Sequence, residues 1–245
     1  MREYLERVRE TAPLIHNITN YVTVNDCANI LLACGGSPIM SDDSGEVEEI
    51  TSICAGLNIN IGTLNRHTVP SMFLAGKKAN LCGHPVLLDP VGAGASALRT
   101  ETAAKLLAEL SVSVVRGNIS EIKALAGAGS AARGVDADAV DAVTEENLDQ
   151  AAALVCAFAA ENHTVAAVSG AIDLVSDGEK TYVIRNGHPI MSRITGSGCM
   201  LSAMTAAYIA ANPGHIAEAA AASFCAMGLC GETAWQRMKP EDGNS

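Results

Sequence analysis

The segment PVLLDPVGAGAS, residues 85–96, decides the fold class of this chain. A short apolar run ends at Asp89, and a glycine-rich turn separates it from a stretch with helical periodicity. Similar apolar or β-branched runs recur along the chain between longer helical patterns, namely PLIHNI, SPIM, GLNINIG, VSVVRGN and TVAAVSG. This alternation predicts an α/β protein with a mostly parallel central sheet covered by helices.

The C-terminal part of the sequence departs from this alternation. LVSDG and TYVIRNG predict two further strands, and Asp177-Gly178 between them predicts a hairpin at the edge of the sheet. After Ile190 two Ala-rich helices are expected, at about 197–212 and 215–236. The stretch Ala126 to Thr144, rich in Gly, Ala and Asp, is the expected mobile excursion.

The bulk composition limits the classes of function. With 245 residues, 49% of them hydrophobic, and no repeat or linker, residues 1–245 are expected to form a single domain. A net charge of −11 opposes a nucleic-acid partner, because such binding depends on Lys and Arg neutralising phosphates. The charged opening MREYLERVRETA lacks the apolar run of a secretory signal, and no membrane partner is expected. Without an export signal, eight cysteines in a chain of this size are expected to be reduced thiols, so we expect a cytoplasmic protein. The absence of a Cys-x-x-Cys pair argues against a structural zinc site.

The segment ITGSGCMLSAM, residues 194–204, carries the first chemical signal. Glycines at the start of a helix let backbone N–H groups approach a phosphate, which the helix dipole also favours. The segment therefore predicts an anion hole for a phosphoryl group. A plain helix entry with Ser197 as N-cap is an equally good interpretation of this motif alone.

Two strand ends carry the charged residues. Asp89 ends an apolar strand, and carboxyl ends of parallel strands are where α/β proteins gather ligands, so Asp89 is a candidate metal ligand. In VVRGNISEI, residues 114–122, Arg116 is suited to a phosphate and Glu121 to hydrated magnesium. A capping box formed by Asn118 and Glu121 explains the same motif without any function, and it is the more frequent case.

The N-terminal segment HNITNYVTVNDCANILLACGGSPIMSDD, residues 16–43, has four asparagines and few charges. Unpaired polar groups beside apolar walls suit a small, neutral, partly aromatic ligand. Asn17, Asn20 and Asn25 are alternatively turn and cap residues. His16 is expected to be a hydrogen-bonded core residue with no role in catalysis.

Six motifs taken together, HNITNYV, GSPIMSDD, LLDPVGAGAS, RGNISEI, VSG and TGSGCM, resemble the hydroxyethylthiazole kinase family in this order. The resemblance runs from about Pro13 to about Trp235. It implies a ribokinase-like three-layer α/β/α fold. It also implies ATP- and Mg²⁺-dependent phosphorylation of the hydroxyl of 4-methyl-5-(2-hydroxyethyl)thiazole, which gives the thiazole phosphate for thiamine phosphate synthesis. The absence of G-x-x-x-x-G-K-[ST] independently excludes a P-loop enzyme.

The same resemblance assigns site residues by matching motifs. It implies Mg²⁺ ligands Asp89 and Glu121, ATP contacts Arg116 and Ser169, thiazole contacts Met40, Gly196 and Asn25, and an anion hole formed by Gly196, Ser197, Gly198 and Cys199. Ser169 stands where many relatives have Thr, a change that keeps the hydroxyl. Cys199 occupies the place of the catalytic Asp of the sugar kinases, and we expect it mainly to orient the alcohol with modest base catalysis. The family also implies a homotrimer with active sites between subunits.

Three other functions remain open from the sequence. One is a ribokinase-like kinase of another vitamin alcohol, such as hydroxymethylpyrimidine or pyridoxal. Another is an ATP-dependent dehydratase, a lyase on the same fold. The third is a nucleotide-binding regulator without turnover, which the presence of Asp89, Glu121 and Cys199 opposes.

Overall fold

The computed structural model describes residues 1–128, 142–239 and 241–243, and all strands in these ranges form one eight-stranded sheet. The strands are β1 (Leu14–Ile18), β2 (Ser37–Met40), β3 (Gly56–Asn60), β4 (Val86–Asp89), β5 (Val114–Gly117), β6 (Val165–Val168), β7 (Asp173–Ser176) and β8 (Thr181–Ile184). Their order across the sheet is β2-β1-β3-β4-β5-β6-β7-β8. Strands β1 to β6 pair in parallel, whereas β7 pairs antiparallel with both β6 and β8.

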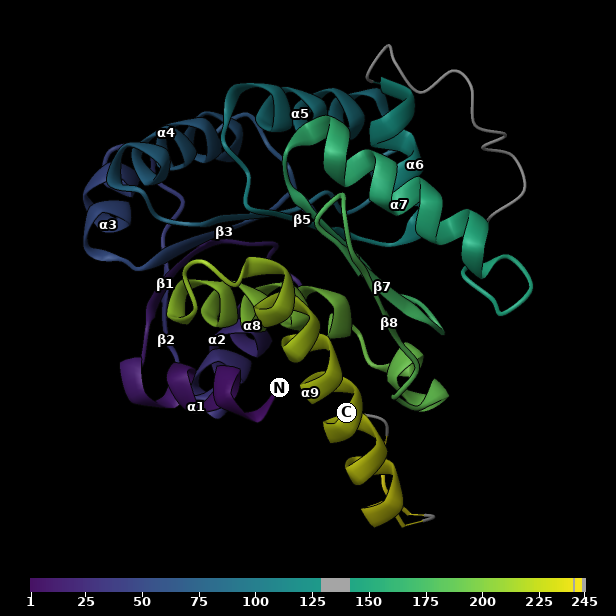
Figure 1. Ribbon diagram of the computed structural model, residues 1–245. Coiled ribbons are helices and arrows are strands. Elements are labelled where there is room, and N and C mark those ends of the chain that lie inside the picture. The colour runs from purple at the N-terminus through teal and green to yellow at the C-terminus, as the bar shows by residue number, and fades with distance from the viewer. Residues whose placement is uncertain (129–141, 240, 244–245) are drawn as a thin grey trace.

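Helices cover both faces of the sheet (Figure 1). One face carries α3 (Val47–Ile53), α4 (Thr68–Cys82), α5 (Ala97–Glu109), α6 (Ile119–Ala128) and α7 (Leu148–Asn162). The other carries α1 (Arg2–Thr11), α2 (Val24–Cys34), α8 (Ser197–Ala211) and α9 (Ile216–Arg237). A 3-10 helix, η2 (Pro189–Arg193), precedes α8. The expected three-layer α/β/α arrangement is therefore confirmed.

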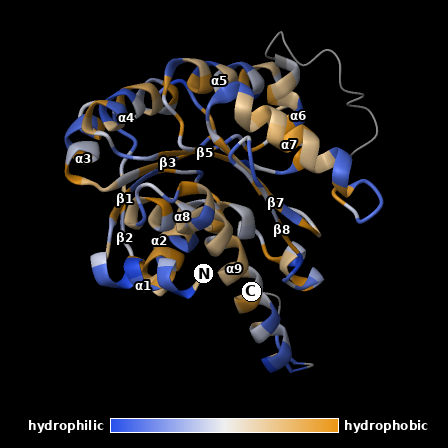
Figure 2. Cartoon of the chain, in the orientation of Figure 1, coloured by the Kyte–Doolittle hydropathy of each residue, from blue (hydrophilic) through white to orange (hydrophobic). Residues whose placement is uncertain are grey.

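Two hydrophobic cores, one on each side of the sheet, hold the layers together. Alternate residues of each parallel strand point to opposite faces, so strands such as β4, which is buried throughout, supply side chains to both cores. Figure 2 shows hydrophobic residues along the central strands, and mostly hydrophilic residues in α1 and at the C-terminal end of α9. Helix α8 is buried almost all round, and its Ala203, Ala206 and Ala207 let it lie close to the sheet and to α9.

The strands and the two Ala-rich helices occur where the sequence predicts them. The hairpin at Asp177-Gly178 is also confirmed, with Gly178 at a φ of 93° that favours glycine. Most of the expected excursion at 126–144 lies outside the described residues. All eight cysteines are free thiols. Among the described helices, none combines the length and the apolarity needed to cross a lipid bilayer.

The register of the sheet brings polar residues together at its carboxyl edge. Asn60, the last residue of β3, pairs with Asp89, the last residue of β4. Arg116 lies near the end of β5, the next strand. Parallel strands end at the same edge, so these three side chains start from adjacent positions. In the sequence, about sixty residues separate Asn60 from Arg116.

Candidate functional site

The start of α8 forms the expected glycine-rich turn. Gly196 is the N-cap with φ 78°, and a Cβ there would overlap the Thr23 side chain, so both backbone and space require glycine. Met200 N donates to Gly196 O at 2.9 Å, which leaves the amides of Gly198 and Cys199 in the first helical turn without an acceptor inside the helix. The interpretation of Ser197 as N-cap is wrong, because Ser197 is the first helical residue and its amide lies 3.4 Å from Ile194 O.

Arg116 lies directly against this turn. A Cβ on Gly198 would come within 2.7 Å of Arg116 Nη1, so the missing side chain of Gly198 makes room for the guanidinium. Arg116 Nη2 donates to Ser169 Oγ at 2.5 Å, and Nη1 lies 3.8 Å from Asp89 Oδ2. The Arg116 Nε atom is buried without a hydrogen-bond partner. A mostly buried cation thus faces the free amides of α8, which is the charge pattern that binds phosphate.

Asp89 is completely buried at the end of β4. Its Oδ2 accepts hydrogen bonds from Asn60 Nδ2 at 2.8 Å and from Ser202 Oγ at 2.7 Å, whereas its Oδ1 has no partner. The pKa of Asp89 is raised to about 6. Burial is the main cause and the Glu121 charge adds to it, whereas the Arg116 charge and the hydrogen bonds from Ser202 and Asn60 act in the opposite direction. The carboxylate therefore has one oxygen available to a cationic ligand.

Glu121 joins two turns at the same edge. Its Oε2 accepts from Asn118 N at 2.8 Å while Glu121 N donates to Asn118 Oδ1 at 2.9 Å, so the capping box foreseen as an alternative is present. Its Oε1 accepts from Gly92 N at 2.8 Å, in the turn after β4. The cap does not exclude a second role, since each carboxylate oxygen keeps a further lone pair.

Cys199 lies beside two asparagine amides. Asn20 Nδ2 is 3.0 Å and Asn60 Nδ2 is 3.3 Å from Cys199 Sγ. The amides also bond to each other, through Asn20 Nδ2 and Asn60 Oδ1 at 3.1 Å. Because Asn60 also donates to Asp89, this chain of hydrogen bonds connects the thiol to the buried carboxylate.

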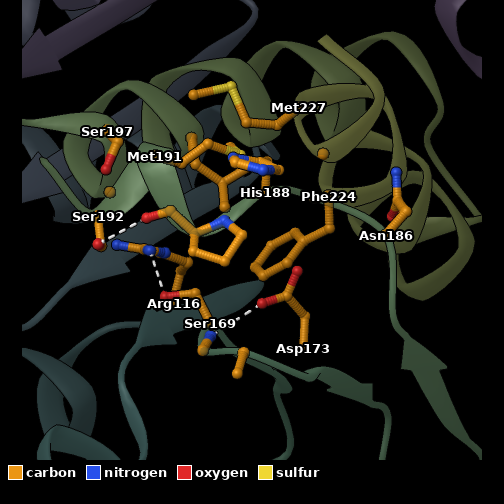
Figure 3. A pocket seen from close by; sticks show the side chains of 17 residues that line it. Arg116, Ser169, Asp173, Asn186, His188, Met191, Ser192, Ser197, Phe224 and Met227 are labelled. Carbon is orange, nitrogen blue, oxygen red and sulfur yellow. Dashed lines mark hydrogen bonds between the residues drawn. The ribbon is translucent and has the colours of Figure 1, made fainter. Parts of the chain in front are cut away.

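A pocket of about 580 Å³ opens beside Arg116 (Figure 3). Arg116, Ser169, Ser197 and Gly198 line one part of it. The remaining wall comes from the loop and 3-10 helix at 186–192, from α8 and from α9. It is mostly apolar, with Pro189, Met191, Leu201, Phe224 and Met227. This combination of an anion-binding part and an apolar part fits a nucleotide.

One acidic residue, Asp173, lies in the apolar part of the pocket. Its Oδ1 accepts from Gly170 N at 2.8 Å, which orients the carboxylate (Figure 3). Burial raises the pKa of Asp173 to about 6, opposed by the hydrogen bond from Gly170 and by the Arg116 charge.

The structure brings most of the residues expected from the sequence into one region. The residues joined there by direct contacts or by a shared pocket wall are Asp89, Arg116, Ser169, Ser197, Gly198 and Cys199. Met40, at the end of β2, packs against the same hydrophobic core as Cys199. Asn25 is exposed in the first turn of α2, two residues after the Thr23 that Gly196 contacts. His16 is a core residue as expected, since its ring nitrogens lie 2.9 Å from Thr51 Oγ1 and from Ser41 O.

Three residues of the site were missed in the sequence. Ser202 and Asp173 lie in helical and turn patterns that gave no signal. A signal for Asn60 was present in the sequence, because GLNINIG places two asparagines in an otherwise apolar strand. Buried amides need partners, so an Asn at the end of such a strand indicates a polar neighbour at the sheet edge.

The residues present fit a Mg²⁺ ion of the kind that binds together with a nucleotide. Within the described residues, no group of three or more His, Cys, Asp or Glu side chains could hold a metal by itself. Mg²⁺ in phosphotransfer sites needs only one or two carboxylates, because water and substrate phosphates supply the other ligands. The unpartnered Oδ1 of Asp89, near the charge of Glu121, meets that requirement.

Comparisons with known proteins agree with this geometry. The model of the hydroxyethylthiazole kinase family matches residues 5–244. A hydroxyethylthiazole kinase of Clostridium acetobutylicum is 62% identical over 100% of this chain and 90% of its own length. The structure of a hydroxyethylthiazole kinase protein from Pyrococcus horikoshii has a TM-score of 0.87 and 39% identity, with 99% of this chain and 87% of that one covered. A ribokinase-like superfamily protein from Enterococcus faecalis, 12% identical with a TM-score of 0.62 over 96% of this chain and 82% of its own, shares the fold. The chain belongs to the hydroxyethylthiazole kinase family.

Proposed function

We propose that this protein transfers the γ-phosphoryl group of ATP to the hydroxyl of 4-methyl-5-(2-hydroxyethyl)thiazole. The product is the thiazole phosphate used for thiamine phosphate synthesis. One observation carries the proposal: the free amides of the α8 turn, the Arg116 guanidinium and the Cys199 thiol meet at one place, next to a nucleotide-sized pocket. Membership of the family supplies the substrate class.

ATP fits the 580 Å³ pocket with its base against the apolar wall and its phosphates toward Arg116. Arg116, held by Ser169, neutralises phosphate charge, and the amides of Gly198 and Cys199 bind the oxygens of the transferred group. Phosphoryl transfer requires little covalent chemistry from the protein, so positioning and charge stabilisation supply most of the rate. The alcohol oxygen attacks the γ-phosphorus in line. Cys199 mainly orients this oxygen and accepts its proton as a modest base.

Asp89 and Glu121 are the proposed Mg²⁺ ligands. Asp89 and Glu121 would hold the ion, and Mg²⁺ would supply neutralisation of phosphate charge. The support comes from the chain itself. Arg116 lies 3.8 Å from Oδ2 of the buried Asp89, but Oδ1 has no partner, and a bound cation would reduce the cost of burying that oxygen.

We propose Met40, Gly196 and Asn25 as contacts of the thiazole alcohol, in a site completed by a neighbouring subunit of a homotrimer. Exposed apolar residues support the second subunit. Tyr21 and Val22, which directly follow Asn20, are 62% and 66% exposed. Such residues beside a substrate site indicate a surface that another chain covers. Sedimentation velocity of the wild type and of Val22→Lys tests this, since a charged residue in the interface should reduce the trimer to monomers.

We further infer that residues 1–245 act as one domain, because all described strands belong to one sheet, and that the protein works in the cytoplasm. The eight free thiols support a reducing compartment.

The release of ADP with three alcohols tests the activity. The thiazole alcohol should give ADP and a phosphate ester in equal amounts, faster than hydroxymethylpyrimidine or pyridoxal. A preference for either of the other two would replace the proposed substrate. ADP formed with a hydrated nicotinamide cofactor, without any phosphate ester, would instead indicate the dehydratase.

A further inference from the structure

Two buried asparagines of the N-terminal half of the chain, Asn20 and Asn60, donate hydrogen bonds to the sulfur of Cys199. Asn20 is 5% exposed, and its Oδ1 accepts from Val22 N and from Thr23 Oγ1, both at 3.1 Å. Because only the oxygen of the amide can accept these two bonds, they determine the positions of Oδ1 and Nδ2, and Nδ2 lies on the opposite side from Val22 N and Thr23 Oγ1. From there it donates to Cys199 Sγ at 3.0 Å and to Asn60 Oδ1 at 3.1 Å.

Asn60 is oriented in the same manner. It is 1% exposed, and its Oδ1 accepts from Gly62 N at 2.8 Å and from Asn20. Its Nδ2 therefore points to Asp89 Oδ2, at 2.8 Å, and to Cys199 Sγ, at 3.3 Å. Each amide uses two donor and two acceptor positions, which is the full capacity of the group. Neither side chain can turn away from the sulfur without breaking several other hydrogen bonds.

A sulfur atom that receives two N–H groups is placed as an acceptor. The two donors stabilise negative charge on it, and they leave its remaining side for a substrate. A cysteine that served only to fill space would need no such partners, because a buried thiol behaves as a small hydrophobe. The cost of burying two amides here is compensated by a network that includes the thiol.

We propose that Asn20 and Asn60 are positioning residues that fix the Cys199 sulfur as the proton acceptor for the alcohol. This inference rests on the proposed function. In the step, the alcohol oxygen forms its bond to the γ-phosphorus and the bond from that phosphorus to the β–γ bridging oxygen breaks, leaving ADP. The alcohol proton moves to the thiolate sulfur, which ends the step as a thiol held by Asn20 and Asn60 and later returns the proton to water.

A double-mutant cycle between Asn20 and Cys199 tests the coupling. Asn20 is the better probe, because Asn60 also contacts Asp89. A hydrogen bond to a charged acceptor corresponds to about tenfold to hundredfold in rate, so Asn20→Ala should lower kcat by at least about tenfold with little change in KM for ATP. In the Cys199→Ala background the same change should alter kcat less than about twofold. A full loss in both backgrounds would mean that Asn20 acts only on the structure.

Asn58 provides a matched control on the same strand. Asn58 lies two residues before Asn60 and is completely buried. It donates to Asn17 Oδ1 at 3.0 Å, a hydrogen bond between two asparagines like that between Asn20 and Asn60. Asn58→Ala should cost comparable stability and leave the coupling to Cys199 intact. If Asn20→Ala does not fold, Asn20→Asp keeps the acceptor for Val22 N and removes the donor to sulfur.

Alkylation gives a readout independent of turnover. Iodoacetamide reacts with thiolate, and the rate at Cys199 is measured by peptide mass spectrometry with the exposed Cys82 and Cys230 as internal references. Asn20→Ala and Asn60→Ala should slow alkylation of Cys199 by about tenfold relative to Asn58→Ala. Equal rates in all three would overturn the proposal. This result stands even if the wild type fails to phosphorylate the thiazole alcohol, so it separates the two claims.

Discussion

Adding one methyl group at Gly198 should displace Arg116 from the phosphate site. In Gly198→Ala the new Cβ would lie 2.7 Å from Arg116 Nη1, and ordinary contact begins at 3.4 Å, so the guanidinium must move by about 0.7 Å. The backbone amide of residue 198 is kept, as is its helical conformation. The change therefore separates the contribution of Arg116 from that of the anion hole.

The expected magnitude follows from that displacement. A misplacement of about 1 Å in a catalytic site costs up to about 100-fold, so we expect kcat/KM for ATP to fall by about 10- to 100-fold. This corresponds to about 1.4 to 3 kcal/mol of lost transition-state stabilisation. The pairing with Ser169 should be weakened too, since it depends on the same guanidinium.

Gly127→Ala is the matched control. Gly127 is also helical, and a Cβ there would meet no atom within 4 Å. It should gain about 0.5 to 1 kcal/mol of stability and leave the kinetics unchanged. Steady-state ADP release at varied ATP, with thermal melting of both variants, makes the comparison. If Gly198→Ala has the kcat/KM of Gly127→Ala, Arg116 has no part in ATP binding.

Three other changes address the remaining groups of the site. Cys199→Ser should lower turnover without changing the ATP affinity measured by calorimetry. Loss of ATP binding in this variant would contradict the role of Cys199 at the alcohol. Cys199→Asp should be active or faster if base strength limits the rate. Asp89→Asn and Glu121→Gln should each raise the Mg²⁺ concentration needed for half-maximal rate, because each removes an anionic ligand; unchanged Mg²⁺ titrations in both would remove them from the metal site. Asp173→Asn should stabilise the ligand-free protein by about 2 to 3 kcal/mol at pH 8. Burial raises the pKa of Asp173 from 3.8 to about 6, so ionisation of this carboxyl costs stability as the pH rises from 3.8 to 6. In denaturant unfolding the gain should vanish below about pH 4, and a gain independent of pH would refute the prediction.

The sequence was sufficient to locate the strands and to place Asp89 and Arg116 at their carboxyl ends. Both conclusions depend on local patterns, namely apolar runs that end in a charged residue. The capping box at Asn118 and Glu121 is likewise a local pattern, and it is present.

The contacts between distant segments were not accessible in this way. The bond from Asn60 to Asp89 depends on the register of β3 against β4, which no single segment encodes. The apolar wall of the pocket depends on α9 lying close to the 186–191 segment. That approach requires Gly228, where a Cβ would lie 2.7 Å from Asn186 Nδ2, and the sequence showed this glycine only as one more small residue in an Ala-rich helix.

The most direct test of the account is a crystal structure with Mg²⁺, a non-hydrolysable ATP analogue and the thiazole alcohol. The terminal phosphate should accept hydrogen bonds from the amides of Gly198 and Cys199, with the Arg116 guanidinium beside it and the alcohol oxygen between the phosphorus and the Cys199 sulfur. A terminal phosphate bound away from these amides and from Asp89 would contradict the account.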